Sequence, residues 1–166
     1  ESVNFPTTGG VLNPNFMGGT YDGYVSRINA SGSGLLASTF IGTAGNDQSY
    51  FVQTDKSGNV YLYGQTGGTY PVSAGVYNNP NGGQFIHKLT PALSATIYST
   101  VVGTGKGTPD ISPTAFLVDI CENIYLSGWG GPLGIFNNPT STTTGLPTTP
   151  GAFQTSSDGE DFYFMT

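Results

Sequence analysis

The residues of this chain with the greatest chemical capacity are its carboxylates, ten in all against four Lys and Arg. Asp47 and Asp110 lie in glycine-rich turns at matching places in the chain, and we treat both as candidate ligand-binding residues. Carboxylates in loops are ligands for Ca²⁺, and two suitably spaced acids are enough for glycoside hydrolysis. The sequence has no Asp-x-Asp-x-Asp run, so the calcium signal is weak, and we predict neither a cofactor nor a dedicated metal site.

The only histidine, His87, limits the chemistry further. A single histidine excludes a metal cluster built on several imidazoles, and any catalytic triad would have to use this one side chain. It aligns with Ser26 in an earlier copy of the same motif, which favours a structural role. We therefore predict no catalytic residue. A secreted carbohydrate-active enzyme with two acids stays open as an alternative.

Trp129 is the third candidate, because it is the only tryptophan and two glycines follow it. An indole at the end of a strand is a good stacking platform for a sugar ring. Packing against the long insertion that follows it is the alternative. We predict a ligand-binding contact at Trp129.

Composition excludes several function classes. The formal net charge is −6, and only 8% of the residues are charged. The chain therefore lacks the clustered Lys and Arg side chains that bind a phosphate backbone, and we predict no nucleic-acid partner. No apolar run is long enough to span a membrane, and we expect neither membrane insertion nor a signal peptide. The single Cys121 excludes an internal disulfide, and we expect it to be buried in a strand.

The chain is organised as a repeat. Ser-Thr-Phe-Ile-Gly-Thr at 38–43 returns as Ser-Thr-Val-Val-Gly-Thr at 99–104. Phe-Pro-Thr-Thr at 5–8 returns as Tyr-Pro-Val-Ser at 70–73 and as Leu-Pro-Thr-Thr at 146–149. The offset from Gly42 to Gly103 is 61 residues and that from Gly64 to Gly128 is 64. Offsets this nearly constant indicate a structural repeat rather than chance similarity, and a period of about 60 residues lies a little above the usual range for propeller blades and solenoid units.

Period-two alternation with frequent Gly and Pro predicts short strands. We expect eight of them, at 23–28, 35–41, 49–54, 60–65, 84–89, 95–102, 114–120 and 124–128. Four antiparallel strands form one predicted blade, so we expect full blades at 21–66 and 84–129. The segment 1–20 would end a preceding blade, 67–83 would connect the two, 130–160 would be a long connection or insertion, and 161–166 would open a third blade.

Residues at matching positions in the copies are expected to stabilise each unit, as ion pairs within a blade or as turn caps. Arg27 matches Lys88, and Asp55 matches Asp119. The matching glycines are Gly42, Gly103, Gly64 and Gly128. In the second copy Glu122 takes the place of a turn glycine, and we expect that turn to be one residue shorter and to differ in conformation.

These motifs in this order resemble the SBBP repeats, the seven-bladed β-propeller repeats of bacterial proteins. The matching segments are 22–29, 38–43, 55–64 and Leu-Pro-Thr-Thr-Pro-Gly-Ala-Phe at 146–153. The stretches 79–89 and 109–119 look more particularly like large cell-surface proteins of gliding Bacteroidetes, which are similar to adhesins exported by the type IX secretion system. The resemblance implies an extracellular location, with the remaining blades of a propeller, and the secretion machinery, as partners.

We therefore expect an all-β fold of four-stranded antiparallel propeller blades, with about two and a half blades in this chain. The expected function is non-enzymatic: adhesion or gliding through binding of polysaccharide or another cell-surface component. A rigid spacer or assembly platform within a surface complex is the alternative from a different class.

Overall fold

The computed structural model describes residues 3–131 and 141–166, which form antiparallel β-sheets and contain no helix. Residues 1–2, and 132–140 of the predicted insertion, lie outside the described residues. The strands are β1 (Gly23–Ile28), β2 (Leu35–Ile41), β3 (Asp47–Thr54), β4 (Val60–Thr66), β5 (Gln84–Leu89), β6 (Thr96–Val102), β7 (Ser112–Val118), β8 (Ile124–Trp129) and β9 (Phe162–Met165). The predicted all-β, antiparallel fold is confirmed, and the first eight strands match the predicted ranges to within two residues. A search of the described part finds no helix able to cross a membrane.

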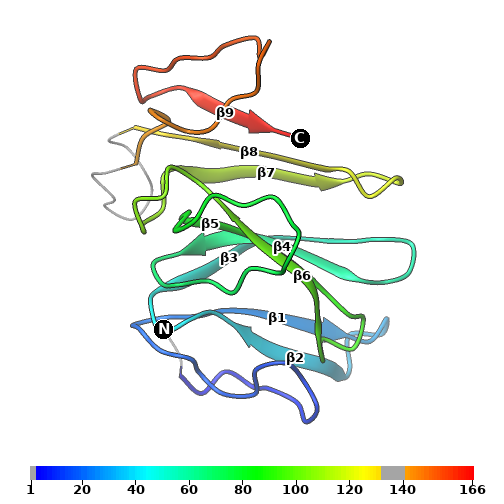
Figure 1. The fold of residues 1–166 in the computed structure, drawn as a ribbon. Coiled ribbons are helices and arrows are strands. Elements are labelled where there is room, and N and C mark those ends of the chain that lie inside the picture. The colour runs from blue at the N-terminus through cyan, green and yellow to red at the C-terminus, as the bar shows by residue number, and fades with distance from the viewer. Residues whose placement is uncertain (1–2, 132–140) are drawn as a thin grey trace.

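Three sheets lie one above another in Figure 1, and β4 lies in the middle sheet. Val60 and Leu62 on one face of β4 join a buried apolar cluster that includes Ile41 of β2. On the other face Tyr63 packs against Phe116 of β7, with ring centroids 5.6 Å apart. Burying one such side chain contributes about 2 kcal/mol to folding. The alternating apolar pattern of β4 thus holds the middle sheet against both of its neighbours.

The strands are grouped into sheets differently from the predicted blades. The sheets are β1-β2, β3-β4-β5-β6 and β7-β8-β9, so each boundary falls in the middle of a predicted unit, 21–66 or 84–129. The segment 67–83 joins two strands of one sheet rather than two blades, and β9 is the third strand of its sheet rather than the first of a new one. A repeated sequence has no intrinsic starting point, so the motif alone did not reveal where one sheet ends and the next begins.

The repeated Pro-containing segments cover sheet edges. Along β6, the backbone N–H of Ser73 donates to the carbonyl of Ser99 (2.9 Å), and the N–H of Ser99 donates to the Ser73 hydroxyl (3.0 Å). Along β2, Thr8 and Ser38 form the same pair of bonds (3.1 and 3.0 Å). Open strand edges invite aggregation. The motif at 5–8 and 70–73 therefore satisfies backbone groups that an edge strand would otherwise expose.

Replacing Gly64 by Ala is expected to destabilise the middle sheet. A Cβ there would lie 2.2 Å from the carbonyl oxygen of Gln48 and 2.5 Å from Cζ of Phe85. Relieving such overlap costs about 2 kcal/mol, which urea unfolding would measure. The matched control is Gly9→Ala, because a Cβ at Gly9 would meet no atom within 4 Å. Equal unfolding midpoints for the two variants would contradict the expectation.

Candidate functional site

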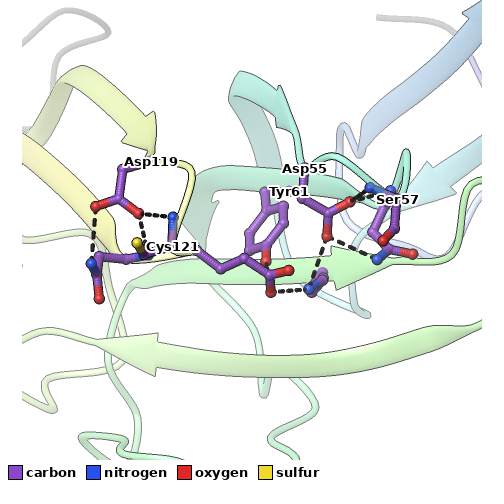
Figure 2. A network of polar contacts seen from close by, with 9 residues as sticks. Asp55, Ser57, Tyr61, Asp119 and Cys121 are labelled. Atoms are coloured by element: carbon purple, nitrogen blue, oxygen red, sulfur yellow. Dashed lines mark hydrogen bonds and ion pairs between the residues drawn. The ribbon is translucent and has the colours of Figure 1, made fainter.

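Lys88 of β5, itself buried, lies at the centre of an ion network. Figure 2 shows Asp55 and Tyr61 of this network. Nζ of Lys88 is 3.0 Å from Oδ2 of Asp55 and 2.7 Å from Oε2 of Glu122, and it lies over the Tyr61 ring at 4.6 Å from the centroid. Asp55 belongs to the β3–β4 turn of the same sheet, whereas Glu122 belongs to the β7–β8 turn of the next. The network therefore joins two sheets as well as two strands.

Asp55 also closes its own turn. Its Oδ1 accepts hydrogen bonds from the backbone N–H groups of Ser57 and Asn59, both at 2.9 Å. Burial by itself raises the pKa of Asp55, but hydrogen bonds from Asn59 and Lys88 outweigh that effect and lower it to about 2. The Asp55 carboxylate is therefore ionised at neutral pH and matched by the Lys88 ammonium.

The β7–β8 turn repeats this geometry, so the expected shorter and different turn is wrong. Oδ1 of Asp119 accepts from the N–H groups of Cys121 (2.8 Å) and Asn123 (2.9 Å), as Figure 2 shows in part. Glu122 has φ of 66°, close to the 79° of Gly58 at the matching position. Cys121 is exposed in this turn rather than buried in a strand, because residues 119–123 belong to the turn.

Glu122 is the functional residue of this network that the sequence prediction missed. A left-handed backbone is unfavourable for a residue with a Cβ. In return, the Glu122 carboxylate forms an ion pair with Lys88 and accepts a hydrogen bond of 3.0 Å from the Tyr61 hydroxyl. Hydrogen bonds from Lys88 and Tyr61 lower the pKa of Glu122. The sequence feature that could have identified Glu122 is an acidic residue at the position where the first copy has the turn glycine Gly58.

Arg27, which matches Lys88 in sequence, has a different environment. It is exposed on β1, and its guanidinium donates to the carbonyl of Pro91 at 3.2 Å. Gly58, which matches Glu122 in the repeat, has no side chain that could pair with Arg27. The two positions are equivalent in the repeat but not in their interactions.

Asp47 and Asp110 are buried turn caps, at 1% and 0% exposure. The backbone N–H and the hydroxyl of Thr43 donate to Asp47 (2.7 and 2.8 Å), and those of Thr104 donate to Asp110 (2.8 and 2.7 Å). Each carboxylate lies at the boundary between two sheets. The matching glycines Gly42 and Gly103 leave room for these carboxylates.

His87 is enclosed between two hydroxyl groups. Its Nδ1 is 2.8 Å from the Tyr70 hydroxyl and its Nε2 is 2.8 Å from that of Thr96. Burial lowers the pKa of His87 to about 4. A neutral imidazole donates from one nitrogen and accepts at the other, so both nitrogens are used within the fold.

Trp129 ends β8, where it pairs with Ser112 and Phe162, and it is half-buried. A Cβ on Gly131 would lie 3.4 Å from Cζ3 of the indole, so Gly131 lies close to this ring. The matching position in β4 is Gln65, whose side-chain amide donates to the carbonyl of Ile111 at 2.6 Å.

The fold and these contacts define an all-β repeat protein whose described charged residues serve mainly to close turns and join sheets. No protein-family model matches the chain. No curated protein matches it at a significant level.

Proposed function

We propose that this chain is part of a non-enzymatic, extracellular β-propeller module of the SBBP-like kind, which binds polysaccharide or another cell-surface component through one end of its sheets. The repeat motifs and the face-to-face stacking of the sheets support the propeller. Further blades are its partners: on β7 and β9, Leu117, Phe162 and Phe164 are 52%, 77% and 66% exposed, and another sheet would cover them.

The observation that carries the binding proposal is a set of aromatic and amide side chains at the end where β4 and β8 finish. The hydroxyl of Tyr50, which is 37% exposed, lies 2.6 Å from Oε1 of Gln48 and 3.0 Å from Oε1 of Gln65. Trp129 is the last residue of β8, and β8 finishes at the same end of its sheet as β4 does in the middle sheet. Flat rings beside amide groups suit a sugar, which offers one apolar face and a rim of hydroxyls.

The non-enzymatic part of the proposal is supported by the contacts of the candidate groups. His87 uses both ring nitrogens within the fold, and Asp47 and Asp110 are buried beneath their turns. A general acid or base must reach its substrate. These groups are better placed to stabilise the sheets.

The test is binding of the folded 166-residue chain to a panel of immobilised polysaccharides. Trp129→Gln, which copies the residue at the matching position of β4, is expected to weaken binding about tenfold by removing a stacking surface. Ile120→Ala, at a 78% exposed side chain in the β7–β8 turn at the opposite end of β8, is the control and should bind as the parent does. If the folded parent binds no polysaccharide, the rigid-spacer function replaces this proposal.

A further inference from the structure

A second acidic cluster lies where the first two sheets meet, apart from the network around Lys88. Asp22 immediately precedes β1, and Asp47 is the first residue of β3. A Cβ on Gly42 would lie 2.4 Å from Oδ1 of Asp22 and 3.2 Å from Oδ2 of Asp47, so both carboxyl groups border the same space. Burial raises the pKa of Asp22, and the nearby charge of Asp47 raises it further.

Three buried oxygens at this place have no hydrogen-bond donor within the described residues. They are Oδ1 of Asp22, Oδ1 of Asp47 and Oγ of Ser49. Asp47 is only 1% exposed, and Ser49 lies two residues further along β3, on the same face. Buried oxygens without partners are costly. The two carboxyl groups border one space, and Oγ of Ser49 would lie 2.4 Å from a Cβ on Gly23, next to Asp22, so an electropositive group is favoured at this place.

The other oxygen of each aspartate is already used by the backbone. The N–H of Met17 donates to Oδ2 of Asp22 at 2.6 Å, and the N–H of Thr43 donates to Oδ2 of Asp47 at 2.7 Å. Burial raises the pKa of Asp47, and a hydrogen bond from the neighbouring Thr66 hydroxyl acts against this increase. Both carboxylates are thus held in place, and Oδ1 of each has no hydrogen-bond partner at normal distance and angle among the described residues.

The matching place in the next repeat shows what neutralises such a carboxylate. Asp110 takes the position of Asp47, and its Oδ1 is 3.0 Å from Nζ of Lys106. Gly83 stands where the first copy has Asp22. The turn that precedes Asp110 is two residues longer than the one that precedes Asp47, and only the longer turn contains a lysine. The second copy therefore pairs one carboxylate with one ammonium, whereas the first brings two carboxylates together without a lysine.

We infer that Asp22 and Asp47 bind a hard divalent cation of the Ca²⁺ class, in the role that the Lys106 ammonium has in the next repeat. Ca²⁺ takes about six to eight oxygen ligands, from carboxylates, carbonyls and water. No three His, Cys, Asp or Glu side chains converge in the described part of the chain. Two carboxylates, the Ser49 hydroxyl and water complete the ligand set. Because Asp22 adjoins β1 and Asp47 begins β3, the ion clamps two sheets together.

The test is equilibrium dialysis of the calcium-stripped 166-residue chain against radioactive Ca²⁺, together with its unfolding at fixed free calcium. One ion per chain is expected, and calcium at ten times its Kd should lower the unfolding equilibrium constant about tenfold. Asp22→Asn removes one charged ligand, and Asp22→Gly copies the second repeat. Both should lose binding, whereas Asp110→Asn should retain it.

Dialysis of the parent chain decides the proposal even if every variant fails to fold. A folded parent that binds no calcium overturns it. So does binding that survives Asp22→Asn, or binding lost only in Asp110→Asn. If the two carboxylates share a proton instead, stability will not respond to calcium at all, and this result also overturns the proposal.

Discussion

The free energy of unfolding is expected to fall by about 3 kcal/mol between pH 7 and pH 4 because of one residue, His87. The ring is 5% exposed, and burial lowers its pKa from 6.5 to about 4. The unfolded chain therefore takes up a proton near pH 6.5, whereas the folded chain resists protonation until about pH 4. The stability that His87 confers while it is neutral is therefore fully present above about pH 6.5, and it is lost as the pH falls toward 4.

The measurement is denaturant unfolding at a series of pH values, followed by the fluorescence of Trp129 and the tyrosines. His87→Gln is the matched variant, because its amide can donate and accept toward Tyr70 and Thr96 without titrating. The difference between parent and variant isolates His87 from the carboxyl groups. Identical slopes of stability against pH in the two proteins would show that the imidazole does not control this range.

Replacing Lys88 by Met is expected to lower the free energy of unfolding by about 3 kcal/mol. The substitution keeps most of the side chain's volume but removes the ammonium that neutralises Asp55, whose side chain is 2% exposed. It also removes the cation above the Tyr61 ring. Glu122 is half exposed, so its share of the network is smaller. The cost comes mainly from leaving a buried carboxylate without its cation.

Arg27→Met is the matched control, because Arg27 occupies the same position of the repeat on an exposed surface. Its effect should not exceed about 0.5 kcal/mol. Adding Asp55→Asn to Lys88→Met should restore part of the lost stability, since the unpaired charge is then absent. A Lys88→Met effect as small as that of Arg27→Met would contradict the network's role in joining the sheets.

Sequence periodicity located most of the candidate positions but not all of their contacts. Lys88 and Asp55 stood out because each has a counterpart one repeat away, and turn closure by Asp55 follows from its local spacing to Asn59. Glu122 was missed because its contact with Lys88 crosses between sheets, and no local pattern marks such a contact. Asp22 was missed because its counterpart in the next repeat is Gly83, so no carboxylate recurs at this position there.

By itself the sequence determined the repeat and, to within two residues, the limits of the first eight strands. These features depend on residues close together in the chain, where period-two alternation and turn chemistry act. Only the tertiary structure decided that β3, β4, β5 and β6 share one sheet, and that Asp47 and Asp110 are buried at sheet boundaries. Both outcomes depend on packing between distant segments, and a repeated pattern is equally compatible with every choice of where one sheet ends and the next begins.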